Sequence, residues 1–202
     1  LPRGRGKGEQ PMRQAQIIRK TKETDIQLDL CLDGGPVEVS TGIGFFEHML
    51  TAFLFYAGFG GKLKVVGDLY VDGHHTVEDT GIVLGQALNR ALGDRKGLRR
   101  FASACLPMDE ALCFTVLDFS NRPFLVFDAD MPQPMIGTYD PCLTEEFLRA
   151  LAVNSGLTLH MKCLYGKNAH HITEALFKSL GAAVKEAVQI TGTGVTSTKG
   201  VL

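Results

Sequence analysis

Apolar and polar residues follow the same order twice along the chain. Residues 78–92 and 174–190 both place apolar side chains at the spacing of a buried helical stripe. When the two stretches are aligned, Gly85 meets Gly181, and alanines coincide two residues later. Small residues at the same steps predict one close packing of a helix on a sheet that is used twice. We therefore expect an internal duplication.

The segments before these two helices repeat as well. Alternating or β-branched stretches predict strands, and an apolar stretch that ends at a glycine predicts one more helix in each half. In the first half the predicted strands cover residues 15–20, 25–31, 37–40 and 62–71, and the helix covers 45–57. In the second half the strands cover 101–106, 112–119, 124–130 and 157–165, and the helix covers 144–154.

Each half therefore reads βββαβα, the first over residues 11–97 and the second over residues 98–192. Because each half is small, we expect the two to pack together as one compact α+β unit, with the sheets packed against each other and the helices outside. The second half carries an additional stretch at residues 131–140 that is rich in proline and methionine.

The composition narrows the class of protein. Of the 202 residues, 45% are apolar and 21% are charged, and the formal net charge is −1. These values are ordinary for a globular protein and imply no general attraction to nucleic acid or to an anionic membrane. No apolar run reaches the roughly 18–20 residues of a membrane span. Five widely spaced cysteines without a Cys-x-x-Cys pair indicate a reducing compartment.

The two ends of the chain have compositions of their own. Residues 1–10 are basic and glycine-rich and lack the apolar core of a secretory signal, so we expect a flexible segment outside the fold. We expect a cytoplasmic protein, with a plastid as the alternative if this segment is a remnant of a transit peptide. Residues 193–202 combine hydroxyls, glycines and Lys199. Such a tail is either a disordered linker or a phosphate-binding segment.

Four of the six histidines stand in two copies of one short motif. The sequence HHTVE at residues 74–78 is matched by HHITE at residues 170–174. Neighbouring side chains on a helix point about 100° apart, so the two histidines of one pair do not readily bind the same ion. Glu78 and Glu174 follow about one helical turn later, on the same face. The motif therefore predicts metal binding in which each pair is split between two ions.

The two remaining histidines complete the set. With His48 and His160, six imidazoles and two carboxylates divide into two groups of three histidines and one glutamate. Four such ligands leave open positions on a six-coordinate ion, as a catalytic site requires, and favour Mn²⁺ or Fe²⁺ over Cu⁺ or Ca²⁺. Taken alone, a histidine such as His48 is more often an ordinary surface or core-edge residue. The repeated motif is the stronger signal.

The cationic residues are weaker signals. Arg100 lies in the basic stretch 95–100 and Arg122 lies in a predicted turn, where both would by default be solvated loop residues. Lys178 lies one helical turn beyond Glu174 and shares its face, which favours a role near the predicted metal.

Longer motifs in the chain resemble imidazoleglycerol-phosphate dehydratase, an enzyme family of histidine biosynthesis. They are GIGFFEHML at 42–50, GDLYVDGHHTVEDTG at 67–81, LPMDE at 106–110, TLH at 158–160, GKNAHHITE at 166–174 and STKGVL at 197–202. The resemblance covers about residues 14–202, with no departure at a predicted ligand. It implies a duplicated fold like the second domain of ribosomal protein S5.

The resemblance also implies an activity and a site. The activity is the dehydration of D-erythro-imidazoleglycerol phosphate to imidazole-acetol phosphate by a homo-oligomer of 24 subunits, with two Mn²⁺ per active site and sites between subunits. The implied metal ligands are His48, His74, His75, Glu78, His160, His170, His171 and Glu174. The implied substrate and phosphate ligands are Glu23, Arg100, Arg122, Lys178, Ser197, Thr198 and Lys199.

The chemistry of this reaction accounts for these residue types. The C–H bond to be broken is not next to a carbonyl, so its activation must come from the imidazole ring of the substrate. A metal on a ring nitrogen favours the imidazolate, whose electrons expel the adjacent hydroxyl and leave a diazafulvene-like intermediate. Glu23 is the first candidate for moving protons and Glu174 is the second. Asp109 and Glu110 either transfer protons as well or only orient their neighbours.

Two other classes of function are open at this stage. A two-metal hydrolase, such as a phosphatase, would release phosphate and form no ketone, although such sites usually contain more carboxylates. In a metal-stapled assembly protein the ions would only join subunits. Chelation would then dissolve the oligomer, and Glu23→Gln would have no measurable effect.

Overall fold

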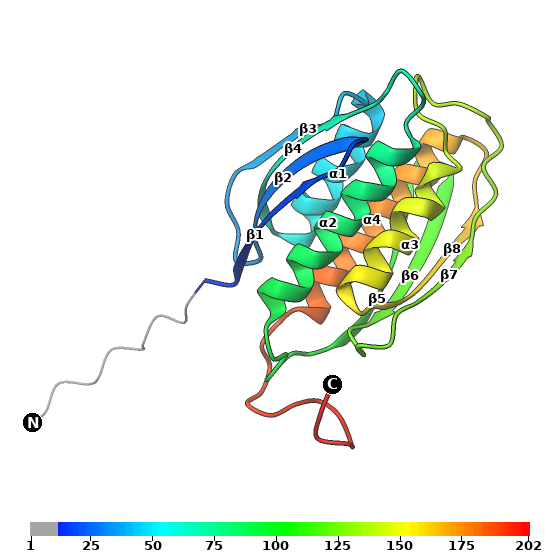
Figure 1. The fold of residues 1–202 in the computed structure, drawn as a ribbon. Helices are drawn as coiled ribbons and strands as arrows, with labels where there is room; N and C mark the ends of the chain where they lie inside the picture. The colour runs from blue at the N-terminus through cyan, green and yellow to red at the C-terminus, as the bar shows by residue number, and fades with distance from the viewer. Residues whose placement is uncertain (1–11) are drawn as a thin grey trace, which may run out of the picture.

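The computed structural model describes residues 12–202, which form two halves with the same order of elements (Figure 1). The first half contains β1 (Gln14–Lys20), β2 (Thr24–Cys31), β3 (Val37–Ser40), α1 (Gly44–Ala57), β4 (Gly60–Gly67) and α2 (His74–Leu92). The second half contains β5 (Phe101–Met108), β6 (Ala111–Asp118), β7 (Phe124–Asp128), α3 (Leu143–Ser155), β8 (Thr158–Tyr165) and α4 (Ala169–Ala187). The predicted βββαβα duplication and the α+β class are confirmed. The segment predicted to be flexible, residues 1–10, lies outside the described residues.

Each half forms one four-stranded mixed sheet. The strand orders are β1-β2-β4-β3 and β5-β6-β8-β7. In both sheets the two central strands are antiparallel, and the edge strand β3 or β7 runs parallel to its neighbour. A parallel neighbour requires a crossover connection, which α1 provides in the first half and α3 in the second.

The four helices lie between the two sheets, so the predicted order of layers is wrong (Figure 1). α2 packs along α3 and α1 packs along α4, so that each helix pair joins the two halves. The buried residues of α2 cover well over half of its circumference when they are placed at about 100° per residue. A helix with so wide a buried surface needs contacts on two sides, which an outer position could not provide.

The glycines that coincide in the two halves allow these helices to approach closely. A Cβ atom added to Gly85 would lie 2.7 Å from Cβ of Asn154 on α3. A Cβ atom on Gly181 would lie 2.9 Å from Cβ of Tyr56 on α1. The repeated small residues therefore pack helix against helix, and the prediction that they pack a helix on a sheet is wrong.

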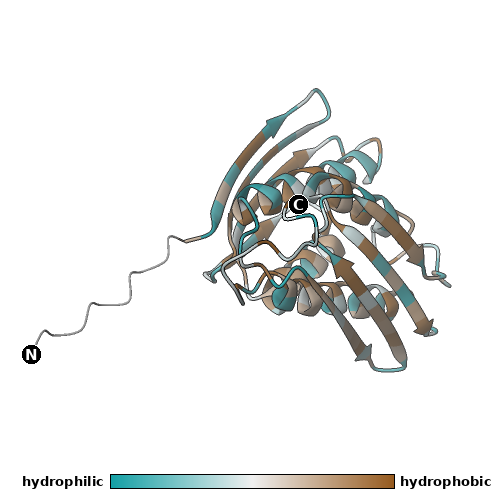
Figure 2. Ribbon diagram, turned by 90° about the horizontal axis from the view of Figure 1, so that it is seen from below, coloured by the Kyte–Doolittle hydropathy of each residue, from teal (hydrophilic) through white to brown (hydrophobic). Residues whose placement is uncertain are grey.

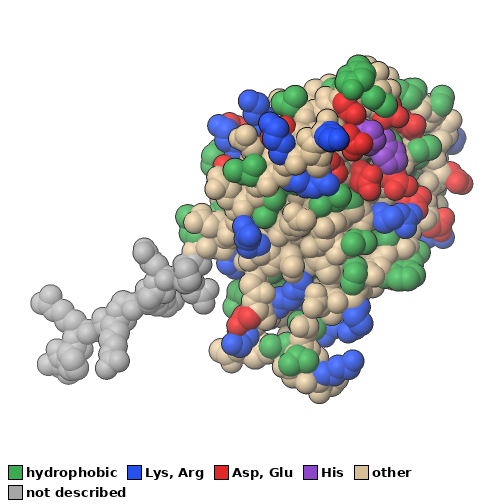
Figure 3. All heavy atoms as spheres, in the orientation of Figure 1, with side chains coloured by type: hydrophobic (Ala, Val, Ile, Leu, Met, Phe, Trp, Pro, Cys, Tyr) green, Lys and Arg blue, Asp and Glu red, His purple; other side chains and the backbone are tan. Residues whose placement is uncertain are grey.

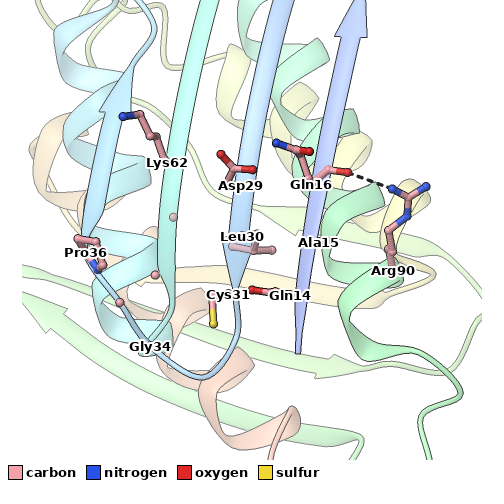
Figure 4. Close-up of a pocket in the computed structure, with 13 residues that line it drawn as sticks. Gln14, Ala15, Gln16, Asp29, Leu30, Cys31, Gly34, Pro36, Lys62 and Arg90 are labelled. Atoms are coloured by element: carbon pink, nitrogen blue, oxygen red, sulfur yellow. Dashed lines mark hydrogen bonds between the residues drawn. The ribbon is translucent and has the colours of Figure 1, made fainter. Parts of the chain in front are cut away.

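The outer faces of the two sheets differ in polarity. Hydrophilic and hydrophobic residues alternate along strands of both sheets (Figure 2). The first sheet presents polar side chains, including Gln16, Asp29 and Lys62, around an open hollow of about 670 Å³ (Figure 4). The second sheet presents apolar side chains, including exposed Phe114 and Val116, around a hollow of about 630 Å³. Within residues 12–202, no helix has the length and apolar composition needed to cross a membrane.

Candidate active site

The two His-His motifs begin the two longest helices at the same end of the helical layer. His74 and His75 are the first residues of α2, and His170 and His171 lie in the first turn of α4. Oδ1 of Asp72 accepts a hydrogen bond from the backbone amide of His74 at 2.7 Å. Asn168, the N-cap of α4, accepts one from the amide of His170 at 2.9 Å. Such side-chain acceptors satisfy free amides and determine where a helix begins. Histidine side chains are visible among acidic side chains at this end of the molecule (Figure 3).

One cluster brings together residues from both halves. Oε2 of Glu174 lies 3.4 Å from Nε2 of His48 on α1 and 3.4 Å from Nε2 of His170. Potential ligand atoms of these three residues all lie within 4.8 Å of one another. Within residues 12–202, they are the only group of three histidine, cysteine or acidic residues that meets this distance. Two imidazoles and a carboxylate in this arrangement have the chemistry of a divalent-metal site.

The corresponding pair in the first half is more open. Nε2 of His74 lies 3.4 Å from Oε2 of Glu78, and both side chains are almost half exposed. Glu174, in contrast, has only 13% of its side chain exposed. The i,i+4 spacing thus aligns histidine and glutamate in both halves, as predicted, but only the second-half pair gains a third residue, His48, from the other half.

The second histidine of each motif is held by a carboxylate. Nδ1 of His75 lies 3.0 Å from Oδ2 of Asp68, and Nδ1 of His171 lies 2.6 Å from Oε2 of Glu110. These hydrogen bonds raise the pKa of both imidazoles. The bond to His171 is also the main reason that the pKa of Glu110 falls to about 2. In both rings Nε2 points away from this partner and remains available as a ligand.

His160 lies elsewhere, so the prediction that it belongs with the other histidines is not met within one chain. It is in β8 between Leu159 and Met161, both of which are buried. Because side chains alternate along a strand, His160 points to the opposite, outer face of the second sheet. There it lines the hollow that also contains Phe114 and Val126. The short motif that contains His160 does not by itself show that this outer face lies away from the other histidines.

Glu23 lies beside the histidine-rich end. It belongs to the turn between β1 and β2, and its Oε1 lies 3.8 Å from Nε2 of His75. Its side chain is 54% exposed. A carboxylate so placed can approach a substrate bound near that ring nitrogen.

Most of the residues predicted to bind phosphate meet at the opposite end of α4. Arg100, Arg122, Ser197, Thr198 and Lys199 line an open hollow of about 550 Å³, together with Phe101 and Thr196. Two hydrogen bonds to Asp118, at 2.6 and 2.9 Å, hold the Arg100 guanidinium, which also donates to the carbonyl of Thr196 at 2.6 Å. The tail is thereby tied to the fold, and its cations and hydroxyls suit a phosphate.

Lys178 does not lie in this hollow. Its Nζ is 4.0 Å from Oε1 of Glu174 and 5.4 Å from the centre of the Tyr56 ring. The backbone amide of Arg100 bonds to the carbonyl of Ala187 at the end of α4, 13 residues after Glu174. At 1.5 Å per residue, the hollow and the Glu174 cluster are roughly 20 Å apart along the helix. The prediction that Lys178 joins the phosphate ligands is therefore not met within one chain.

Asp68 is the functional residue that sequence analysis did not single out. It follows β4 by one residue, and its side chain is only 12% exposed. An aspartate at the end of a strand, seven residues before a predicted ligand, has no distinctive spacing. Only the bend of the chain between β4 and α2 brings it to His75.

Comparisons with known proteins agree with this architecture. The model of the imidazoleglycerol-phosphate dehydratase family matches residues 41–184. The imidazoleglycerol-phosphate dehydratase of Ruminiclostridium cellulolyticum is 51% identical over 194 residues, covering 95% of this chain and 100% of its own. That of Streptococcus sanguinis is 53% identical with the same coverage.

Two solved structures share the fold. Imidazoleglycerol-phosphate dehydratase from Staphylococcus aureus superposes with a TM-score of 0.80 at 38% identity and covers 90% of this chain and 100% of its own. The Pyrococcus furiosus structure, in complex with (S)-C348, has a TM-score of 0.80 at 40% identity and covers 92% and 100%. Together with the relatives, these matches show that the chain belongs to the imidazoleglycerol-phosphate dehydratase family and is an enzyme of the hydro-lyase class.

Proposed function

We propose that this enzyme dehydrates D-erythro-imidazoleglycerol phosphate to imidazole-acetol phosphate in histidine biosynthesis, with two Mn²⁺ per active site. The observation that carries the proposal is the convergence of His48, His170 and Glu174 from two halves of the chain. The cationic hollow at the C-terminal tail supports a phosphorylated substrate. The family supports the reaction.

The donor set fits manganese. Imidazole nitrogens mixed with carboxylate oxygens suit Mn²⁺ and Fe²⁺, whereas thiolates would favour softer ions. In this proposal His48, His170 and Glu174 hold one ion, and His74 and Glu78 hold part of the second. His75 and His171 contribute Nε2 to the two sets, one histidine to each. In this proposal His160 is also a metal ligand, contributed by a neighbouring copy of the chain, because it lies on the outer face of β8, apart from the other histidines of its own chain.

The separation of the two groups supports sites formed between subunits. The substrate has only a three-carbon chain between its ring and its phosphate, far less than the roughly 20 Å along α4. One chain therefore cannot hold both ends of the substrate with its own histidine cluster and its own tail. We propose that the tail of one copy meets the histidines of another, in a homo-oligomer that we expect to have 24 subunits. The exposed apolar face of the second sheet supports such self-association.

The chain's own residues divide the remaining work. When bound, the metal would act as a Lewis acid that stabilises negative charge on the imidazole of the substrate. Arg100 and Arg122 would bind the phosphate and fix the orientation of the glycerol chain. Glu23 would move the proton, because it is half exposed and is not committed to a ligand pair. Glu174 is less suited to proton transfer, since two imidazoles surround it.

The location of the enzyme is part of the proposal. The five cysteines are all free thiols. Free thiols support a reducing compartment, and we propose the cytoplasm.

The proposal is tested by a coupled assay for imidazole-acetol phosphate with EDTA-stripped enzyme, with and without added Mn²⁺. We expect activity only after Mn²⁺ is restored. We also expect Glu23→Gln to lower kcat by about 100-fold while Mn²⁺ binding is retained, as for the loss of a general acid–base group. Release of inorganic phosphate without a ketone would indicate a hydrolase. Full activity of the Glu23→Gln variant would refute the proton-transfer role.

A further inference from the structure

The hairpin that opens each half has a different length. Four residues, 21–24, lie between the last paired residues of β1 and β2. Only two, Asp109 and Glu110, lie between the last paired residues of β5 and β6. Glu23 and Glu110 occupy corresponding places just before the second strand of each half. Because the turns differ, these two glutamates meet different atoms of the histidines that face them.

Glu110 is held by three groups. Its Oε1 accepts hydrogen bonds from the backbone amides of Lys167 at 3.1 Å and Asn168 at 2.9 Å. Its Oε2 lies 2.6 Å from Nδ1 of His171. An ionised carboxylate can only accept, so the hydrogen lies on Nδ1 and Nε2 keeps its lone pair. One side chain thus fixes both the turn before α4 and the ring at its start.

Glu23 makes different contacts. Nδ1 of its neighbour His75 is already paired with Asp68, whose two carboxylate oxygens lie 3.1 and 3.0 Å away. The carboxylate of Glu23 therefore meets the other side of the ring, 3.8 Å from Nε2. It is also the more exposed of the two glutamates, at 54% against 37%.

We propose that Glu110 is a positioning residue that fixes the tautomer of His171, so that Nε2 is presented to a metal ion. The identity of that ion rests on the proposed function. Asp68 acts in the same way on His75, but from the segment after β4. Within residues 12–202, the side-chain oxygens of Asp68 bond only to that ring, so no backbone amide fixes which oxygen faces it.

This difference makes Glu110→Gln a sharp test. Oε1 of the new side chain must still face the amides of Lys167 and Asn168, so its NH₂ group must face Nδ1 of His171. An NH₂ group can only donate, which moves the ring hydrogen to Nε2 and blocks that nitrogen as a ligand. We expect Mn²⁺ affinity to fall by about 10- to 100-fold, as is usual when the partner of a ligating histidine is lost. We expect the melting temperature of the metal-free protein to change little.

Two matched variants serve as controls. Glu186→Gln makes the same amide change at the far end of α4, where the exposed carboxylate pairs with Arg99 at 3.3 Å. It should leave Mn²⁺ affinity within about twofold, which is the scatter of a surface change. Asp68→Asn should cost less affinity than Glu110→Gln, because the free amide can turn its oxygen toward Nδ1 of His75.

The measurement is titration of metal-free protein with Mn²⁺, with free ion followed by electron paramagnetic resonance, together with the melting temperature before metal is added. A second comparison uses His171→Ala with and without Glu110→Gln. If Glu110 acts through His171, the added change has no further effect on affinity. If Glu110→Gln alone lowers the melting temperature of the metal-free protein, this second comparison still tests whether Glu110 acts through His171.

The outcomes separate the two proposals. If the unaltered protein binds no Mn²⁺, the proposed function fails. If the unaltered protein binds Mn²⁺ and Glu110→Gln binds it equally well, the positioning role alone fails. The positioning role is also overturned if Glu110→Gln lowers Mn²⁺ affinity equally in the unaltered protein and in the His171→Ala variant. Glu110 would then act only on the turn before α4.

Discussion

The two halves of the chain share one topology, but they use it differently. Both start their last helix with two histidines and align a glutamate one turn later. The second-half glutamate, Glu174, is nearly enclosed and meets two imidazoles, whereas Glu78 is half exposed and meets one. The outer face of the first sheet is mostly polar, with Ile18 and Val66 as exposed apolar residues, and that of the second is more apolar. The duplication therefore preserved the scaffold and the helix starts, while turns and outer surfaces diverged.

The largest expected effect is a difference between Glu174 and Glu78, the glutamates of the two motifs. We expect Glu174→Gln to lower kcat/KM by about 1000-fold, which corresponds to roughly 4 kcal/mol, and Glu78→Gln to lower it by about 100-fold, or roughly 3 kcal/mol. The reason is that Glu174 is the shared partner of two imidazoles. Steady-state kinetics with measured metal content provide the comparison, and Glu186→Gln on the exposed surface of α4 is the control. Equal losses for the two glutamates would remove the proposed asymmetry.

The two ends of α4 are expected to work in active sites that join different subunits. His170→Ala and Arg122→Ala should each be inactive alone. If each active site joins the histidines of one copy to the tail hollow of another, random mixing of the two variants should restore about a quarter of the sites. Activity after the mixed subunits are reassembled with Mn²⁺ is the readout. No recovery in a mixture shown to contain both variants would place the whole site in one chain.

The difference between the outer sheet faces can be tested at two corresponding positions. Val116→Asp puts a charge on the apolar face of the second sheet, whereas Asp29→Asn changes the polar face of the first. If the outer face of the second sheet is buried between subunits, Val116→Asp should yield smaller assemblies in analytical ultracentrifugation, because its unpaired charge would be desolvated. Asp29→Asn should leave the size of the assembly unchanged. An unchanged assembly of the Val116→Asp variant would show that this face is not an interface.

The smallest expected effect concerns the close helix contacts at Gly85 and Gly181, which the two halves have in common. Gly85→Ala and Gly181→Ala should each destabilise the protein by about 1–3 kcal/mol, because the new Cβ meets the facing helix. The melting temperature should fall by about 2–4 °C per kcal/mol. Gly44→Ala is the control, since a Cβ there meets nothing within 4 Å. A large loss in only one half would show that the two helix contacts are not equivalent.

Much of this protein could be predicted from the chain alone because the signals are local. Strand and helix patterns repeat with the same spacing, and the repeat predicted βββαβα halves. The spacing between His170 and Glu174 predicted that the two share a helix face, since a helix returns to the same face every three to four residues. The long motifs likewise pointed to the family.

The remainder depended on contacts between segments far apart in the chain. An apolar helix face does not specify whether a sheet or another helix covers it, so the order of layers and the glycine contacts were predicted wrongly. The alternation in β8 places His160 opposite Leu159 and Met161, but only the tertiary structure decided that the helices cover the side of Leu159 and Met161 and leave His160 on the outer face. No characteristic spacing in the sequence predicts three of the contacts, which are His48 with Glu174, Asp68 with His75, and Glu110 with His171. The tertiary structure decided these pairs because turn lengths and helix packing, rather than local patterns, bring such side chains within hydrogen-bonding distance.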